Sequence, residues 1–370
     1  MLKAPEFTKG NEALAYGALK TGLNAYFAYP ITPSSEIPET LAKEFGNPLY
    51  PQFRAFLQAS SEIEAINMVI GAASTGAKVM TASSGPGFSL KQEGISYANA
   101  TQLPMVVVNV NRAGPGLGNI GPEQSDYFQA TKGGGHGGYK NIVLAPNSVQ
   151  EMASFPKLGF DLAFKYRNPV VILADAFLGQ LKEDIVFPEI SEERYDTKWA
   201  TTGAEAGKKR RLLSSLRLDF QEQNTYAESL LKKYDTITRE EQRAESYLTD
   251  DADLIFVAYG IPSRLCKQVA QEIRKKREIR AGLFRPITLS PFPTRELSKL
   301  EKPDRRFVVV ELNMGQMYYD VKLAIPNAKV SLVYKLGGLI PTLKEIETKA
   351  LKEKDKEKEQ EPVTVRQLRA

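Results

Sequence analysis

The chain has 370 residues, of which 42% are hydrophobic and 25% charged, and its formal net charge is +5. This composition is ordinary for a globular protein of about two domains. No run approaches the ~18 apolar residues of a membrane-spanning helix, and the first residues lack an apolar signal core. The single cysteine, Cys266, excludes internal disulfides and a four-cysteine iron–sulfur cluster, and the single histidine, His136, argues against a multi-histidine zinc site. We therefore expect a cytoplasmic protein with no membrane association.

The mildly basic charge balance is compatible with phosphate-bearing ligands or with an acidic partner protein. Part of it is the basic cluster at 207–211, which is followed by Leu212, Leu213, Leu216 and Leu218. This amphipathic pattern favours a solvated helix face or a subunit contact. Because aromatic residues are not interleaved with the basic ones, the pattern argues against a nucleic-acid surface.

The first 195 residues alternate strand-like and helix-like segments. Apolar runs predict strands at 25–29, 53–58, 78–82, 105–110, 141–144 and 170–173. Helical patterns fall at 12–21, 35–44, 61–75, 90–101 and 148–166. Such alternation predicts βαβ units, and the continuous apolar strands predict a parallel sheet covered on both faces. We therefore expect an α/β domain over residues 1–195.

The composition changes after this domain. Residues 196–250 are rich in Lys, Arg, Glu and Gln and lack strand-like runs, so we expect a helical linker that crosses a surface. A smaller α/β domain is expected over 251–347. Its strands are predicted at 253–259, 280–283, 306–312 and 329–333, and its helices at 262–275 and after Pro341. Residues 348–370 are expected to form a charged tail, either an extended helix or a disordered segment.

The turn after the first of these strands is the most informative local feature. Pro30 and Pro33 restrict the backbone on both sides of Thr32, and a helix opens directly afterwards. Open parallel sheets bind ligands at the carboxyl ends of their strands, so Thr32 stands where a ligand contact is expected. A rigid turn in which Thr32 only caps the helix is the alternative.

Two glutamates lie in the first turn of the helix expected at 61–75, with Ser60 or Ser61 as its N-cap. Glu62 shares a helical stripe with apolar residues, so its carboxylate would be costly to bury without a partner. The helix dipole alone also explains an acidic residue at this position, and it explains Glu64 equally well. The pattern does not separate the two.

Arg112 follows the strand at 105–110 almost directly, so its guanidinium can face the same strand-end crevice and clamp a carboxylate. A surface arginine beside a glycine-rich turn is the alternative. The glycine clusters at 114–118 and 132–138 do not have the spacing of a dinucleotide or phosphate loop, so we expect them to permit close backbone approach. His136 is expected to be a polar loop residue, with a secondary substrate contact as the alternative.

Several segments together resemble the 2-oxoacid:ferredoxin oxidoreductases, which are thiamine-diphosphate enzymes of anaerobic metabolism. These segments are YPITPSS at 29–35, EIEAINMVIGA at 62–72, SLKQEGIS at 89–96, NRAGPGLG at 111–118, ATKGGGH at 130–136, RPITLSPFP at 285–293 and ELNMGQ at 311–316. The resemblance covers residues 8–345 and is closest to the α subunit of the branched-chain (3-methyl-2-oxobutanoate) type. The 2-oxoglutarate type shares most of these motifs.

The resemblance implies a pyrimidine-binding thiamine diphosphate domain followed by a domain similar to the transketolase C-terminal domain. It implies the coenzyme A-dependent oxidative decarboxylation of a 2-oxoacid to an acyl-CoA and CO₂, with electrons passed to ferredoxin. The chain lacks a Gly-Asp-Gly followed by Asn-Asn, the usual site for the diphosphate and its metal. The resemblance therefore implies that a β subunit shares the thiamine diphosphate, and that Mg²⁺ and [4Fe-4S] clusters lie on partner subunits, together with γ and ferredoxin-like δ subunits.

The resemblance also implies roles for individual residues. Glu62 holds the position of the glutamate that hydrogen-bonds N1′ of the aminopyrimidine, a contact that activates the cofactor. Arg112 and Thr32 match the substrate-binding arginine and threonine, and Tyr29 and Pro30 are expected to wall the pyrimidine pocket. No metal ligand is expected in this chain. The alternatives are a subunit of another thiamine-dependent carboligase and a non-catalytic scaffold subunit.

Overall fold

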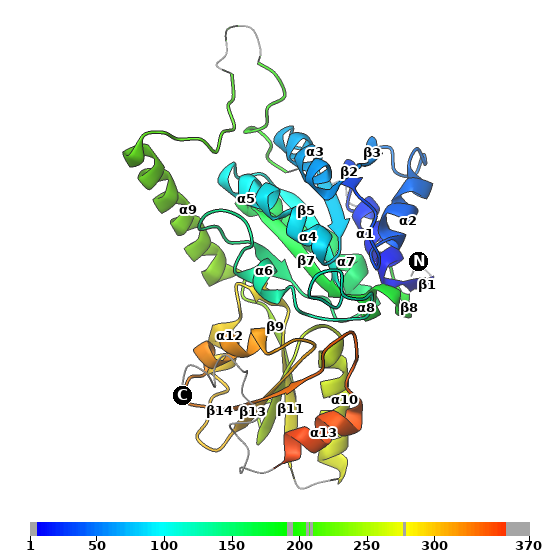
Figure 1. Ribbon diagram of the computed structural model, residues 1–370, viewed down its shortest axis with the longest axis vertical. Coiled ribbons are helices and arrows are strands. Elements are labelled where there is room, and N and C mark those ends of the chain that lie inside the picture. The colour runs from blue at the N-terminus through cyan, green and yellow to red at the C-terminus, as the bar shows by residue number, and fades with distance from the viewer. Residues whose placement is uncertain (1–5, 191–194, 205–206, 208–209, 277–278, 353–370) are drawn as a thin grey trace.

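The computed structural model describes residues 6–190, 195–204, 207, 210–276 and 279–352, and it arranges them in two α/β halves (Figure 1). The first half is built on a seven-stranded sheet in the order β12-β6-β7-β5-β4-β2-β3. All neighbouring strands of this sheet are parallel except β12 and β6. Its strands are β2 (Ala25–Ala28), β3 (Ala55–Gln58), β4 (Val79–Ser83), β5 (Met105–Asn111), β6 (Ile142–Leu144), β7 (Pro169–Asp175) and β12 (Thr288–Ser290).

Helices cover both faces of this sheet because alternate strand residues are apolar on each side. Val106 and Val108 of β5 pack in the core beneath α1 and α7, whereas Met105 and Val107 pack beneath α3 and α5. The helices of this half are α1 (Gly10–Lys20), α2 (Glu36–Glu44), α3 (Glu62–Ser74), α4 (Pro86–Leu90), α5 (Gln92–Ala100), α6 (Tyr127–Thr131), α7 (Val149–Tyr166) and α8 (Ala176–Gln180). The predicted parallel-sheet α/β architecture is confirmed.

The second half is a smaller α/β unit with a five-stranded sheet in the order β14-β13-β10-β11-β9. Its strands are β9 (Ala244–Tyr247), β10 (Leu254–Val257), β11 (Ala281–Pro286), β13 (Arg306–Glu311) and β14 (Lys329–Tyr334). Its helices are α10 (Gly260–Lys276), α11 (Thr294–Ser298), α12 (Gln316–Ala324) and α13 (Leu343–Leu351). Within the described residues, no helix is long and apolar enough to cross a membrane.

The segment expected to be a helical linker differs from that expectation in two ways. It does contain one long helix, α9 (Phe220–Glu240), but it also contains β9, which pairs antiparallel with β11 at the edge of the second sheet. The leucines at 212–218 lie in a stretch without helix, and Leu212 and Leu218 are 86% and 81% exposed. The expected helix face is therefore wrong there: Leu212 and Leu218 do not pack against the chain, and packing of an apolar face supplies most of the stability of a helix. A subunit contact stays a prediction.

Other local features were not apparent from the sequence. Two short strands, β1 (Glu6–Lys9) and β8 (Lys182–Ile185), form an antiparallel pair beside the main sheet. The helix expected at 90–101 is interrupted at Lys91, which ends α4 and precedes α5. Most of the predicted charged tail, from residue 353 onward, lies outside the described residues.

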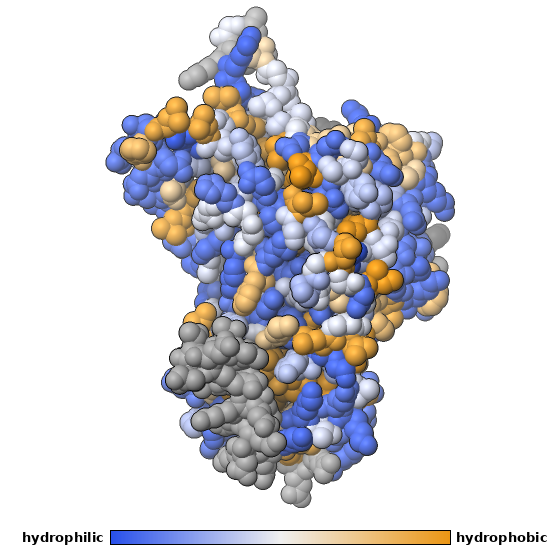
Figure 2. All heavy atoms as spheres, viewed as in Figure 1, coloured by the Kyte–Doolittle hydropathy of each residue, from blue (hydrophilic) through white to orange (hydrophobic). Residues whose placement is uncertain are grey.

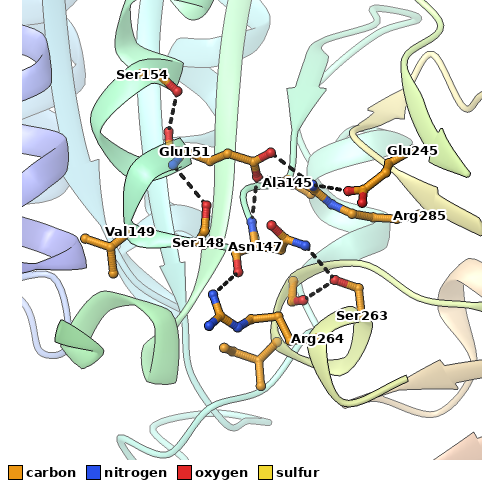
Figure 3. Close-up of polar contacts among 12 residues, drawn as sticks. Ala145, Asn147, Ser148, Val149, Glu151, Ser154, Glu245, Ser263, Arg264 and Arg285 are labelled. Atoms are coloured by element: carbon orange, nitrogen blue, oxygen red, sulfur yellow. Dashed lines mark hydrogen bonds and ion pairs between the residues drawn. The ribbon is translucent and has the colours of Figure 1, made fainter. Parts of the chain in front are cut away.

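Arg285 of β11 joins the two halves. Its side chain is only 2% exposed. Arg285 Nη1 donates to Glu151 Oε1 at 2.9 Å and to Glu245 Oε2 at 3.2 Å, and Nη2 donates to the Ala145 carbonyl at 3.1 Å. Figure 3 shows the side chain between these groups, with Asn147 and Arg264 forming a second polar contact between the halves. Since Glu151 and Ala145 belong to the first half, one buried cation links both sheets.

We predict that Arg285→Met lowers the free energy of unfolding by about 3–5 kcal/mol, because it leaves the Glu151 carboxylate without its buried partner. Urea unfolding of the two variants and the wild type measures this. Arg280→Met is the matched control, since Arg280 is 59% exposed and pairs with Asp253 at the surface, where an ion pair contributes little. An equal loss in both variants would contradict the role of Arg285.

Candidate functional site

The predicted site residues meet at the carboxyl edge of the first sheet. Strands β2, β4 and β5 are parallel neighbours there, so the segments that follow them emerge side by side. Arg112 Nη1 donates a hydrogen bond to the Thr32 carbonyl at 2.9 Å, which joins the turn after β2 to the end of β5. A Cβ atom on Gly85, in the turn after β4, would lie 3.3 Å from Arg112 Cγ, so this turn packs against the arginine.

Burial separates the two glutamates that the sequence left equivalent. Glu62 begins α3 and is 5% exposed, and its carboxylate forms no hydrogen bond within the described part of the chain. Glu64 is exposed, and its carboxylate accepts hydrogen bonds from Ser60 N at 3.0 Å and from Ser60 Oγ at 2.7 Å. Ser61 is the N-cap, as expected. The Glu64 carboxylate therefore has hydrogen-bond partners at the start of its own helix, and the Glu62 carboxylate does not.

Gly87, in the first turn of α4, makes room for Glu62. A Cβ atom at this position would lie 2.3 Å from Glu62 Oε1 and 2.3 Å from Ser83 Oγ, which is well inside van der Waals contact. The Glu62 carboxylate therefore lies against the Ser83–Gly87 turn, the same turn that contacts Arg112 through Gly85. This turn brings the buried acid and the arginine into one site.

Several polar atoms around this turn are buried without a hydrogen-bond partner among the described residues. They are Ser83 Oγ, Ser84 Oγ, Lys91 Nζ, both side-chain polar atoms of Asn111, and Arg112 Nε. Buried polar groups are normally paired, and those left unpaired need a reason such as a bound ligand. The cluster can therefore receive a polar heterocycle or a carboxylate at this edge of the sheet.

A cavity of about 910 Å³ adjoins Arg112 between the two halves. Arg112 is the cation among the described residues that line it, and Glu123 and Asp126 are its acids. Leu90, Met314 and Leu336 give it an apolar wall. Burial raises the pKa of Asp126, and a hydrogen bond from Asn109 opposes this. The sequence reasoning missed Glu123, Asp126 and Leu336, although Met314 lies in the noted segment at 311–316.

The other expected residues occupy different places. Tyr29 and Pro30 lie directly after β2 and are exposed, and they are not among the residues that line the cavity beside Arg112, so their role in a pyrimidine pocket stays a prediction. His136 is exposed, and its carbonyl accepts a hydrogen bond from Ser96 Oγ. It lines a separate cavity of about 460 Å³ beside α5 and α9, and the structure does not bring it to Arg112. Gly135 confirms the expected close backbone approach, since its Cβ would lie 2.4 Å from the Gln92 carbonyl oxygen.

Known proteins match this chain over nearly its whole length. A family model described as pyruvate flavodoxin/ferredoxin oxidoreductase, thiamine diP-bdg, matches residues 16–248, and one described as pyruvate:ferredoxin oxidoreductase core domain II matches residues 252–346. The ketoisovalerate oxidoreductase subunit VorB of Methanothermobacter marburgensis is 51% identical over 93% of this chain and 96% of its own length. This chain belongs to the 2-oxoacid:ferredoxin oxidoreductase family. The predicted family resemblance is therefore confirmed.

Further relatives of this oxidoreductase subunit agree. The 2-oxoglutarate synthase subunit KorA of Methanocaldococcus jannaschii is 36% identical over 94% of this chain and 99% of its own length. A solved 2-oxoglutarate:ferredoxin oxidoreductase from Magnetococcus marinus, with 2-oxoglutarate, coenzyme A and succinyl-CoA bound, has a TM-score of 0.83 at 26% identity, covering 94% of this chain and 65% of that one. A split gene transketolase, an inactive β4 tetramer, matches at a TM-score of 0.58 and 14% identity over 92% of this chain and 97% of that one. The transketolase likeness shows the fold alone.

Among the described residues, no group of three or more His, Cys, Asp or Glu side chains is placed to hold a metal ion. Cys266 is a free, buried thiol, and burial raises its pKa well above the ordinary value.

We predict that Gly87→Ala destabilises the protein by about 1–3 kcal/mol, because the added methyl group must displace the Glu62 carboxylate or the Ser83 hydroxyl. Gly71→Ala is the control: it lies on the exposed face of α3 with nothing within 4 Å of its Cβ position, so it should stabilise by about 0.5–1 kcal/mol. Thermal unfolding measures both. A stabilising Gly87→Ala would show that the site has more room than the structure gives it.

Proposed function

We propose that this chain is the α subunit of a 2-oxoacid:ferredoxin oxidoreductase that acts on branched-chain 2-oxoacids. The complex converts the 2-oxoacid and coenzyme A to an acyl-CoA and CO₂ and passes two electrons, one at a time, to ferredoxin. We further propose a cytoplasmic location, and a division of the chain into a pyrimidine-binding domain (1–195), a linker (196–250), a transketolase C-terminal-like domain (251–347) and a tail.

The buried, unpaired carboxylate of Glu62 carries this proposal. A carboxylate in this environment needs a partner from outside the chain, and the N1′ edge of the thiamine diphosphate pyrimidine ring provides a nitrogen that shares a proton with it. The unpaired hydroxyls of Ser83 and Ser84 lie on the adjoining turn and fit the same polar ring. When bound, the cofactor supplies the carbanion chemistry at its C2 atom. Glu62 holds and moves the proton at N1′ that makes this chemistry possible.

Arg112 is the proposed clamp for the substrate carboxylate. The Thr32 carbonyl fixes one of its terminal nitrogens, whereas Nε is buried and has no partner among the described residues. Part of the guanidinium fork is therefore held in place and part is available for a carboxylate. Thr32 itself is exposed beside this contact, and we propose that its hydroxyl contacts the same substrate.

The cavity beside Arg112 favours a branched aliphatic substrate over 2-oxoglutarate. An apolar wall suits an aliphatic side chain. A second carboxylate would enter a cavity whose lining contains Glu123 and Asp126 and, among the described residues, no cation besides Arg112. A second substrate carboxylate in this cavity would be repelled by these two acids, so the cavity favours 3-methyl-2-oxobutanoate as the substrate. The 2-oxoglutarate type remains the second candidate because of the likeness to KorA.

A partner subunit is proposed to close the site. Large apolar side chains near it are exposed in this chain, among them Tyr29, Ile63, Leu90, Leu117, Ile120 and Met314. Figure 2 shows separate apolar patches across the face in view, over the middle of the first half. Exposed apolar surface of this kind is typical of an interaction site. We propose that a β subunit covers it and supplies the diphosphate and Mg²⁺ site, and that γ and ferredoxin-like δ subunits complete the complex with its [4Fe-4S] clusters.

We predict that Glu62→Gln in the complex co-purified with its partner subunits slows hydrogen–deuterium exchange at C2 of the bound cofactor by about a hundredfold or more, because an amide cannot take up and release the proton. Nuclear magnetic resonance of the quenched cofactor measures the rate. Glu64→Gln is the matched control and should exchange at the wild-type rate, since Glu64 is bonded to Ser60 at the surface. Near-normal exchange in Glu62→Gln would refute the assignment.

We predict that the complex reduces ferredoxin with 3-methyl-2-oxobutanoate at a kcat/KM at least about tenfold above that with 2-oxoglutarate. Met314→Lys places a cation on the cavity wall. It should lower the ratio of kcat/KM for 3-methyl-2-oxobutanoate to kcat/KM for 2-oxoglutarate. The panel also includes pyruvate and an aryl 2-oxoacid. A preference for 2-oxoglutarate would overturn the substrate assignment. Product formation without ferredoxin reduction would indicate a carboligase subunit instead.

A further inference from the structure

The loop that follows Arg112 folds back onto it. This hairpin loop, residues 113–122, closes where the backbone N–H of its first residue donates to the Gly121 carbonyl at 3.0 Å. Arg112 and Pro122 pair beside it in an isolated antiparallel bridge. Glu123 is the next residue in the chain, so it lies close to the strand end that carries the proposed substrate clamp.

The buried carboxylate of Glu123 joins the hairpin loop to the second half of the chain. Glu123 is 3% exposed. Its Oε2 atom accepts hydrogen bonds from Gly114 N at 3.0 Å and from Ser125 Oγ, and its Oε1 atom accepts one from Gly337 N at 3.0 Å. Gly114 belongs to the hairpin loop, whereas Gly337 belongs to the β14–α13 loop, residues 335–342. Each carboxylate oxygen therefore holds a different one of these two loops.

The backbones of the two loops also touch directly. A Cβ atom on Gly121 would lie 2.7 Å from Gly338 Cα and 2.8 Å from the Gly338 carbonyl oxygen, so a side chain has no room between them. Asn119 Nδ2 donates a hydrogen bond to the Gly337 carbonyl at 3.2 Å. The hairpin loop and the β14–α13 loop are thus held at one spacing, by Glu123 and by this backbone contact.

This spacing sets the width of the cavity beside Arg112. Gly114 and Gly116 line the cavity from the hairpin loop, and Leu336 and Gly337 line it from the β14–α13 loop. Arg112 directly precedes the hairpin loop, and Leu336 is part of the apolar wall. The distance from the proposed carboxylate clamp to the apolar wall therefore depends on how closely the two loops are held together.

We propose that Glu123 is a positioning residue that sets the length of the aliphatic side chain that the site accepts. It acts through the two loops that it holds, and not through a contact with the reacting atoms. This inference rests on the proposed function, in which Arg112 binds the substrate carboxylate and the cavity receives the side chain. It gives a reason for a buried carboxylate in a cavity proposed to take an aliphatic group.

Glu123→Gln tests the contact of both loops with almost no change in size. A carboxylate accepts hydrogen bonds at both oxygens, whereas an amide accepts at its oxygen and donates at its nitrogen. The variant can therefore accept from Gly114 or from Gly337, and its NH₂ group then faces the N–H of the other. We expect the loop that loses its acceptor to move away and the cavity to widen.

The first measurement is amide hydrogen exchange in the co-purified complex, followed by mass spectrometry. In Glu123→Gln, the peptide with Gly114 or the peptide with Gly337 should exchange about tenfold faster than in the wild type, because a buried hydrogen bond to a carboxylate is lost. Glu183→Gln is the matched control. Glu183 also joins the two halves, accepting from Arg264 Nη2 at 2.6 Å, but it is not among the described residues that line the cavity. Both peptides should exchange at the wild-type rate in this control.

The second measurement uses three 2-oxoacids whose side chains carry no charge: 2-oxobutanoate, 3-methyl-2-oxobutanoate and 4-methyl-2-oxopentanoate. Because their charges are equal, the series responds to the size of the side chain. In the Glu123→Gln complex, KM for 3-methyl-2-oxobutanoate should rise about tenfold with kcat within about twofold of the wild type, since a binding contact is lost and the reacting groups are not. The rise should be smaller for 4-methyl-2-oxopentanoate, which reaches further across a wider cavity. Glu183→Gln should keep the wild-type KM values.

Gly121→Ala widens the same contact without changing any charge, and it also serves if Glu123→Gln folds poorly. Its added methyl group must push the Gly338 backbone away. We expect KM to change in the same order across the three substrates. Agreement between the two variants would show that the spacing of the loops, and not the charge of Glu123, is responsible.

The results distinguish this inference from the proposed function. A complex that reduces ferredoxin with none of the three 2-oxoacids would overturn the proposed function and with it the role of Glu123. An active complex in which Glu123→Gln leaves amide exchange unchanged, or in which KM rises equally for all three substrates or not at all, would overturn the role of Glu123 alone. Faster exchange together with size-dependent KM values in both variants supports it.

Discussion

The rest of the site depends on the burial of one carboxylate, that of Glu62. Glu62 can occupy its place because α3 begins at Glu62, after the N-cap Ser61, and because Gly87 has no side chain to fill the same space. Helix α3 does not need this acid for its own stability, since Glu64 already accepts the hydrogen bonds of Ser60. The helix dipole favours an acid in this first turn, but no hydrogen bond among the described residues offsets the free-energy cost of burying the Glu62 carboxylate. This is why we assign its use to a ligand.

The second half of the chain completes the cavity beside Arg112. Gln124, in the loop that connects Arg112 to α6, accepts a hydrogen bond from Leu312 N at 2.9 Å and donates one to the Tyr259 carbonyl at 3.1 Å. One apolar core continues from Val143 of the first sheet to Phe284 and Met317 of the second half. Since Met314 and Leu336 come from that half, a shift of one half against the other would open the cavity beside Arg112. The junction is thus part of the proposed substrate site.

Much of the first sheet could be read from the sequence because buried parallel strands are continuous apolar runs, as in 105–110. The convergence of Thr32 and Arg112 could be expected too, because both follow parallel strands. The choice between Glu62 and Glu64 required either the family resemblance or coordinates, since helical periodicity gives both a plausible place. Strands β9 and β12 were missed because each is short and gains its pairing from residues distant in the chain. The burial of Lys91 could not be predicted, because the sequence indicates a single helix at 90–101 and the structure has two helices, α4 and α5, that meet at this residue.

Strand β12 shows that the two halves cannot be regarded as interchangeable modules. Thr288–Ser290 pair with β6, although the segments on either side of them belong to the second half. The edge strand of the first sheet therefore comes from residues more than a hundred positions after β6 in the chain. A fragment cut near residue 250 would bare the backbone of β6, the kind of edge that recruits other chains into aggregates. During synthesis the first sheet can gain its last strand only after β12 has been translated. If recombination replaced the second half with that of another protein, the replacement would have to contain a strand able to pair with β6.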